Sequence, residues 1–100
     1  MEPVSGLVPG ISQRVIARDE KGHTWVRILE YAPGTDTTPN GVQVHDYYEE
    51  IFIVEGSIID LTLNCEFSKG FAASRPPGMR HGPWKSTGGC VMFEVVYHLD

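Results

Sequence analysis

The chain has no dense run of basic side chains. Its 8 lysine and arginine residues are scattered singly and are outnumbered by 13 acidic residues, which gives a formal charge of −5. A nucleic-acid interface needs clustered positive charge to neutralise phosphates. The charge pattern therefore argues against a nucleic-acid partner, and we expect a small molecule to be the ligand instead.

Long apolar runs are missing as well. The longest, around 51–54 and 91–96, are followed or interrupted by Glu55 and Glu94. A spanning helix needs about 20 apolar residues, so we expect no membrane partner. The amino end has neither a basic region nor an apolar block, and we expect no signal peptide. The two cysteines, Cys65 and Cys90, form no Cys-x-x-Cys pair, which favours reduced thiols in a cytoplasmic protein.

No amphipathic helical pattern of useful length is present either. Short segments rich in β-branched and aromatic residues recur instead at a spacing of about 8–12 residues, with glycine and proline between them. The predicted strands cover 12–17, 24–31, 42–45, 49–55, 58–64 and 90–98, with a tight hairpin turn at Gly56 and Ser57. The sequence predicts an all-β sandwich or barrel in a single domain over 1–100, with 1–22 as a lead-in segment.

One group of polar residues does not fit a plain β-core. Gln43 and His45 are two residues apart, so on a strand they point to the same face. The same alternation puts the Glu49 carboxylate on one face with Ile51 and Ile53. A lone buried carboxylate costs several kcal/mol unless it is paired or binds a metal. A metal at the mouth of a barrel would resolve the conflict, and His81, from the second Gly/Pro-rich stretch, could reach the same point.

The spacing of these residues resembles the two motifs of the cupin superfamily. The second motif reads Gly, five residues, Pro-x-Gly, two residues, His, and it is met by Gly70, 76–78 and His81; the closing Asn is Lys85 here. The first motif ends in His-x-His, three or four residues, Glu, six residues, Gly. Residues 43–45, Glu49 and Gly56 fit this spacing, with Gln43 in place of the first histidine and Thr37 in place of the leading glycine.

The two motifs cover about half the chain, from 37 to 85. The resemblance implies a small barrel of two packed antiparallel sheets (a jelly roll), often a homodimer, with a metal-binding core at about 34–98. It also implies that one divalent metal ion is bound by the residues at the matching positions. These positions are Gln43, His45, Glu49 and His81.

The ligand set narrows the choice of metal. Two histidines and one carboxylate suit Fe(II) with open positions for substrate and oxygen, so Fe(II) is preferred over Mn, Zn and Ni. Gln43 offers a neutral amide oxygen to the ion, or it donates an amide hydrogen to a metal-bound water or substrate. Glu50 is the rival of Glu49 for the carboxylate position, and both the spacing to Gly56 and the strand parity favour Glu49.

Arginine side chains are candidates for holding an anionic substrate, because the guanidinium group binds carboxylates with a two-pronged fork. Arg75 and Arg80 flank the Pro-Pro-Gly turn next to His81, and Arg27 is a third candidate. The alternative for each is a solvated surface charge. We expect Glu49, Arg75 and Arg80 to be catalytic, with Glu49 or a nearby group moving a proton.

Two functions follow from the resemblance. Residues 74–83 look similar to small cupins in the group that contains β-diketone-cleaving dioxygenases, which implies a metal-dependent enzyme acting on a small oxygenated molecule. The reaction would be dioxygenase-like, or an isomerase, lyase or cyclase reaction in which the metal polarises a carbonyl. The same stretch also resembles the cupin domains of zinc-binding anti-sigma factors, which implies a non-catalytic sensor of a ligand or metal. A storage-type or sugar-binding cupin is a third option that the small size disfavours.

Overall fold

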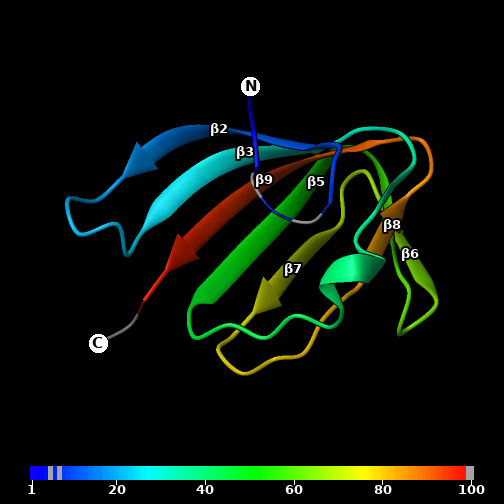
Figure 1. Ribbon diagram of the computed structural model, residues 1–100. Helices are drawn as coiled ribbons and strands as arrows, with labels where there is room; N and C mark the ends of the chain where they lie inside the picture. Colours follow the sequence, from blue (N-terminus) through cyan, green and yellow to red (C-terminus); the bar gives the residue numbers. More distant parts are fainter. Residues whose placement is uncertain (5, 7, 99–100) are drawn as a thin grey trace.

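The protein folds as a curled, all-antiparallel β-structure (Figure 1). The computed structural model describes residues 1–4, 6 and 8–98 of the chain. Its strands and its one 3-10 helix follow in chain order. They are β1 (Glu2–Pro3), β2 (Ile11–Arg18), β3 (Trp25–Tyr31), β4 (Thr35–Asp36), η1 (Thr38–Asn40), β5 (Tyr48–Asp60), β6 (Cys65–Ser68), β7 (Ala72–Arg75), β8 (Trp84–Ser86) and β9 (Cys90–Tyr97). Among the residues that the structure describes, none belongs to a helix with the length and apolar character needed to span a membrane. The prediction of an all-β fold built from two antiparallel sheets is confirmed.

Strand β5 joins the two sheets. Its first part pairs with β9 on one side and β7 on the other, in a sheet that continues through β3 and β2 to β1. Its last residues pair with β6 and β8 in the second sheet, and β8 also pairs with β4. The lead-in segment predicted at 1–22 is thus part of the first sheet, because it contains both β1 and β2.

The change from one sheet to the other occurs at a bulge in β5. The register against β9 shifts between Ile53 and Glu55, so the inward-facing residues change from odd to even numbers after it. Gly56 lies there with a φ of 77°, and a Cβ at this position would clash with the carbonyl oxygen of Gly89. The bulge bends the strand, and no side chain larger than hydrogen fits at its centre.

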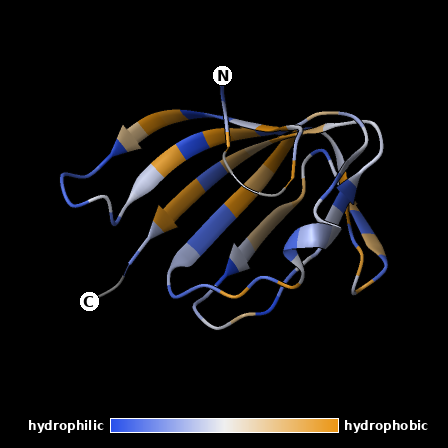
Figure 2. Ribbon diagram, viewed as in Figure 1, coloured by the Kyte–Doolittle hydropathy of each residue, from blue (hydrophilic) through white to orange (hydrophobic). Residues whose placement is uncertain are grey.

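The core lies on the inner face of both sheets. Alternation along β5 and β9 turns Ile53, Met92 and Val96 inward, whereas Phe52 and Phe93 face outward. The same alternation carries charged residues into the interior, and hydrophilic segments interrupt the hydrophobic strands β3, β5 and β9 (Figure 2). The parity predicted for Glu49 and the two isoleucines after it is therefore what the structure has.

Two of the predicted strand boundaries are wrong. The chain does not turn back at Gly56 and Ser57 but continues to Asp60, and the turn lies at 61–64, where Asn64 has a φ of 52°. The predicted strand at 42–45 is reduced to a single bridge between Gln43 and His81, because this segment pairs with another loop rather than with a strand. Strands β1, β4, β6, β7 and β8 were not predicted.

Candidate metal centre

His81 is held in place by backbone hydrogen bonds between two loops. The Gln43 N–H donates to the His81 carbonyl oxygen at 2.7 Å, and the His81 N–H donates to the Gln43 carbonyl oxygen at 3.0 Å. The Gly78 N–H donates to the His45 carbonyl oxygen at 3.0 Å. The two loops carry the histidines of the two sequence motifs. They therefore lie side by side at one end of the barrel, as Figure 1 shows.

This pairing brings His45, Glu49 and His81 into one cluster. The Nε2 atoms of His45 and His81 are 3.0 Å apart, and His45 Nε2 is 3.9 Å from Glu49 Oε1. One ligand atom from each residue can be chosen so that all three lie within 4.8 Å of one another. The Nδ1–H of His45 donates to the Tyr47 carbonyl oxygen at 2.9 Å, which leaves Nε2 with its lone pair facing the cluster.

The geometry of this cluster fits a metal ion. Two ring nitrogens 3.0 Å apart are held together either by a shared proton or by an ion to which both donate. Two nitrogens bound at right angles to one ion, each about 2.1 Å away, are also about 3 Å apart. Burial, followed by the nearby Arg75 charge, lowers the pKa of His81 to about 4, so its ring is neutral at pH 7, as a ligand must be.

The other ring nitrogen of His81, Nδ1, is a second indication that a ligand binds beside this ring. His81 Nδ1 is buried and has no hydrogen-bond partner among the residues that the structure describes. Buried polar atoms are rarely left in this state in the absence of a ligand or water. The ring therefore has one more interaction to make with whatever occupies the cavity.

Arg75 is the immediate partner of Glu49. Its Nη1 donates to Glu49 Oε1 at 2.8 Å, and both side chains are largely buried. Register explains the contact, because Arg75 on β7 lies directly opposite Glu49 on β5. The guanidinium group also lies over the ring of Trp84, 4.5 Å from its centroid. The negative charge of Glu49 is thus balanced by Arg75 in the interior, and Arg75 is held by its contacts with Glu49 and Trp84.

A second buried ion pair lies beside the first. Arg27 Nη2 is 2.7 Å from Glu94 Oε1, and the two residues are direct partners across β3 and β9. Burial, followed by the negative charge of Glu49, raises the pKa of Glu94 to about 7. The cavity therefore contains a carboxyl group that holds a proton close to neutral pH.

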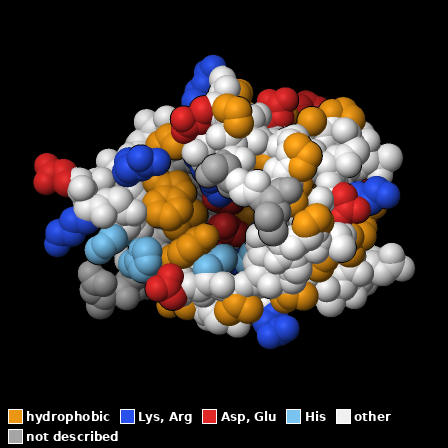
Figure 3. All heavy atoms as spheres, in the orientation of Figure 1, with side chains coloured by type: hydrophobic (Ala, Val, Ile, Leu, Met, Phe, Trp, Pro, Cys, Tyr) orange, Lys and Arg blue, Asp and Glu red, His pale blue; other side chains and the backbone are white. Residues whose placement is uncertain are grey.

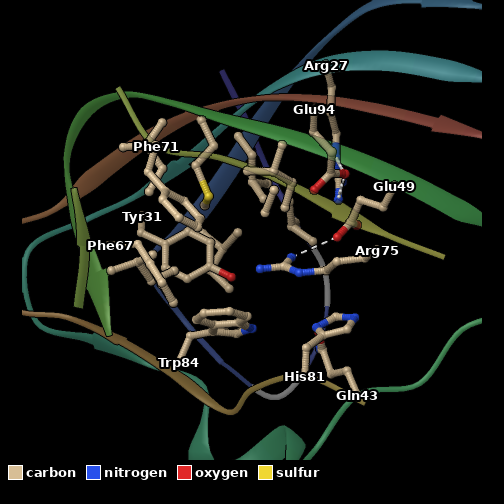
Figure 4. A pocket seen from close by; sticks show the side chains of 18 of the residues that line it. Arg27, Tyr31, Gln43, Glu49, Phe67, Phe71, Arg75, His81, Trp84 and Glu94 are labelled. Carbon is tan, nitrogen blue, oxygen red and sulfur yellow. Dashed lines mark hydrogen bonds and ion pairs between the residues drawn. The ribbon is translucent and has the colours of Figure 1, made fainter. Parts of the chain in front are cut away.

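These side chains line a cavity of about 260 Å³ inside the barrel. Figure 4 shows that its wall has two halves: Arg27, Glu94, Glu49, Arg75 and His81 lie on one side, and Tyr31, Phe67, Phe71 and Trp84 on the other. The cavity opens on the face drawn in Figure 3, where acidic and histidine side chains are visible inside a hollow bordered by hydrophobic ones. A ligand entering here meets charge on one side and aromatic rings on the other.

The predicted site residues do not all meet in this cavity. His45, Glu49, His81 and Arg75 come together, and Gln43 lies beside His81 at the edge of the cavity with an exposed side chain. Arg80 is exposed and lies outside the cavity lining. Glu50 points away, since its carboxylate accepts hydrogen bonds from Ser74 and Tyr97.

Sequence reasoning missed Glu94 as a site residue. It was noted only as a charge that interrupts the last apolar run, although alternation with Cys90, Met92 and Val96 puts it on the buried face of its strand. A buried acid needs a counter-charge, and Arg27 on an apolar strand is the matching cation. The pairing of those two strands could not be read from the sequence, because they are more than sixty residues apart.

Comparisons with known proteins support the fold. A scan against models of protein families found no match, and a search of curated protein sequences found none. Solved structures with the same fold include an RmlC-like cupin protein from Ralstonia eutropha JMP134, with a TM-score of 0.79 and 14% identity over 97% of this chain and 62% of that one. An acetylacetone dioxygenase from Acinetobacter johnsonii has a TM-score of 0.70 and 13% identity over 91% of this chain and 64% of that one.

A further solved structure is a polyketide cyclase from Streptomyces resistomycificus, with a TM-score of 0.68 and 22% identity over 95% of this chain and 68% of that one. The chain spans less than two thirds of the length of the first two of these proteins. Nearly the whole chain is covered in each comparison. The protein has the fold of the cupin superfamily.

Proposed function

We propose that this protein is a metal-dependent cupin enzyme acting on a small oxygenated organic molecule that chelates the ion. The observation that carries the proposal is the cluster of His45, Glu49 and His81 at the edge of an open cavity, with two ring nitrogens 3.0 Å apart. A divalent ion held there would act as a Lewis acid toward a bound carbonyl or enolate oxygen, and iron(II) would also react with oxygen.

The charges around the cluster favour an anionic substrate or one that can become an enolate. Arg27 and Arg75 carry two positive charges, and Glu49 and Glu94 carry two negative charges when both are ionised. With the proton that Glu94 holds near neutral pH, the four side chains have a net charge of +1 before any metal is counted. A divalent ion makes the cavity more positive still, and a bound enolate or carboxylate would offset that charge.

Each polar side chain then has a defined task. Arg75 orients Glu49 and presents its remaining N–H groups to the cavity, where they can donate to a substrate oxygen. The Tyr47 carbonyl fixes the tautomer of His45. Glu94 is the group that can give or take a proton near neutral pH, a role that the sequence prediction gave to Glu49 or a nearby group. Arg80 would act only on a part of the substrate that extends beyond the cavity.

The names of two structural neighbours support this substrate class. One is an acetylacetone dioxygenase and another is a polyketide cyclase, and both share the fold at 13% and 22% identity. We propose a dioxygenase-like reaction, with an isomerase, lyase or cyclase reaction as the alternative when the bound metal is not iron. The aromatic half of the cavity wall suits a molecule with an apolar part.

The first test is the metal content of anaerobically purified protein by plasma mass spectrometry. We expect about one metal ion per chain in the wild type and loss of that ion in His81→Ala. His23→Ala is the matched control, because His23 is exposed and belongs to no metal-ligand cluster among the described residues. Its metal content should equal that of the wild type.

The identity of the metal directs the activity assay. Iron leads to oxygen-uptake measurements with β-dicarbonyl compounds, and manganese, zinc or nickel leads to product analysis without oxygen. A protein that binds no metal even after reconstitution would contradict the metalloenzyme proposal. It would favour the non-catalytic ligand-sensing module suggested by the resemblance to anti-sigma-factor cupins.

A further inference from the structure

A second hollow lies next to the candidate site. It has a volume of about 360 Å³ and is bordered by the 61–64 turn, by β6 and β7, and by the loop after β7. We call it the outer groove and define it by its large apolar side chains. These are Val42, Leu63, Phe67, Phe71, Met79 and Trp84.

The outer groove is continuous with the interior cavity, because several residues line both. The shared residues are Phe67, Phe71, Ala73, Arg75, His81 and Trp84. Two of them, Arg75 and His81, belong to the polar half of the candidate site. A molecule that binds in the interior cavity with one end at the metal ligands can therefore extend into the outer groove without leaving the protein surface.

Most of the residues that line the outer groove are apolar, and its cationic residues are Arg75 and Arg80. Its one carboxylate, Asp60, is occupied by backbone N–H groups: Thr62 and Leu63 donate to Oδ1 at 2.9 and 3.0 Å, and Gly82 donates to Oδ2 at 3.4 Å. The Thr62 hydroxyl group donates to the Gly82 carbonyl oxygen at 2.7 Å, which ties the turn to the loop. Asp60 thus holds the walls together and offers no charge to a ligand.

Several apolar side chains of the outer groove have nothing to cover them. Leu63 is 67% exposed and Met79 is 44% exposed, and Val42 and Phe71 are exposed as well. Scattered exposed apolar residues are ordinary, but these come from four separate segments and converge on one hollow beside a cluster of metal ligands. Their arrangement suits an apolar ligand group that would remove them from water.

The volume of the interior cavity also favours a ligand that extends into the outer groove. The interior cavity, at about 260 Å³, is smaller than most ligand-binding pockets, which start at roughly 300 Å³. It can hold a small oxygenated molecule, but a long apolar substituent would need further space. We propose that the substrate has two parts, an oxygenated head that binds beside His45, Glu49, His81 and Arg75, and an unbranched or flat apolar arm that lies in the outer groove. The inference about the oxygenated head rests on the proposed function, whereas the inference about the apolar arm rests on the outer groove alone.

The test separates the head from the arm by varying the length of the arm. Calorimetry measures the dissociation constants of straight-chain alkane-2,4-diones of five to nine carbons on the metal-loaded protein. A second series, straight-chain carboxylates of four to eight carbons, is measured on the metal-free protein, where Arg75 can hold the carboxylate. In both series we expect affinity to rise about fourfold for each added methylene, the gain for burying a CH₂ group.

The variant that tests the groove is Leu63→Asn combined with Met79→Gln. Both substitutions are neutral and close in size, and both sites are exposed, so the fold should be retained. We expect the gain per methylene to fall clearly below the wild-type value of about fourfold, because two of the six large apolar side chains of the groove become polar. The matched control is Leu61→Asn, because Leu61 lies in the same turn but does not line the groove. Its gain per methylene should equal that of the wild type.

The possible outcomes are distinct. Diones that bind with no dependence on length would overturn the groove inference and leave the proposed function standing. Carboxylates that bind with the expected length dependence, when no dione binds, would support the groove and contradict a β-dicarbonyl head group. A length dependence that persists in the double variant would overturn the inference, and so would binding of neither series. If the double variant has a different oligomeric state in solution from the wild type, the groove is a contact between copies of the chain. That outcome would also overturn the inference.

Discussion

At the scale of single residues, the contact between Arg75 and Glu49 has the clearest energetic consequence. Replacing Arg75 with Met should leave the Glu49 carboxylate buried without its partner, because the salt bridge at 2.8 Å is largely shielded from water. We expect the metal-free variant to lose about 3 kcal/mol of unfolding free energy, as buried pairs do when one partner is removed. Urea unfolding in the presence of a chelator measures this loss.

The control for this variant is Lys69→Met. Lys69 pairs with Glu55 at 3.5 Å on the surface, where both side chains are mostly exposed, and such pairs contribute little to stability. Adding metal should stabilise Arg75→Met more than it stabilises the wild type, because the ion takes over the charge of Glu49. Equal losses in the two Met variants would show that Arg75 does not hold a buried charge.

The other buried acid gives the protein an unusual pH dependence. Glu94 has a pKa raised by burial to about 7, compared with 4.5 for an ordinary glutamate, so between these values the folded state holds a proton that the unfolded state has lost. The free energy of unfolding therefore falls as pH rises through this window. His81 acts in the opposite direction, because its pKa is lowered by burial from 6.5 to about 4, and the unfolded state binds the extra proton.

The two effects oppose each other between pH 4.5 and 6.5, the range in which the windows of Glu94 and His81 overlap. Glu94→Gln removes the falling contribution and leaves the rising one. We therefore expect the stability of the metal-free variant to rise more steeply with pH than that of the wild type, by up to about 1.4 kcal/mol per pH unit. Urea unfolding at a series of pH values measures both slopes, and parallel curves would contradict the buried protonated carboxyl group.

Much of the candidate site could be predicted at the residue scale. The spacing of His45, Glu49 and His81 indicated a common cluster, and strand parity favoured Glu49 over Glu50, as the inward direction of its side chain bears out. The acid at 94 could not be placed from local sequence, because its role depends on which strands are neighbours. Whether Gln43 binds the ion stays a prediction.

At the scale of elements, the bulge in β5 is the feature on which both sheets depend. Gly56→Ala adds a methyl group that would clash with the Gly89 carbonyl oxygen, and it forces a φ of 77° on a residue with a side chain. We expect a loss of at least about 2 kcal/mol of unfolding free energy, measured by thermal or urea unfolding.

A second glycine separates strain from steric clash. Gly70 has a φ of 90° but nothing within 4 Å of an added Cβ, so Gly70→Ala carries the backbone strain alone. We expect its loss to be about 1 kcal/mol and clearly smaller than that of Gly56→Ala. Equal losses would mean that the close approach of the Gly89 carbonyl oxygen contributes nothing.

The misplaced hairpin has a physical explanation at this scale. Gly56 and Ser57 have the residue types of a tight turn, but here the glycine serves the bulge and the strand continues for four more residues. The true turn, 61–64, contains two leucines and a threonine and therefore has the composition of a strand. Its shape depends on the Asp60 carboxylate, which accepts the N–H groups of Thr62 and Leu63, a turn signal of Asp that the strand-like residues after it obscure.

At the scale of the whole molecule, the fold class followed from the spacing of short β-rich segments and from the two motifs. The connections of the strands did not, because β5 takes part in both sheets and pairs with β6, β7, β8 and β9. Local sequence reports which residues alternate but not which strands are adjacent. The expected homodimer stays a prediction; the outer face of the first sheet carries exposed Phe52 and Phe93 on paired strands.

The position of Arg75 has one consequence for the order of events in the cavity. Its guanidinium group neutralises Glu49 at 2.8 Å, and the residue also lines both hollows. An ion that binds Glu49 weakens the hold of that carboxylate on Arg75 and frees the guanidinium group for an anion, and an anion that attracts Arg75 frees Glu49 for the ion. Thermodynamic linkage makes the two effects equal in size. Metal and anionic ligand should therefore bind with positive cooperativity, each raising the affinity of the chain for the other.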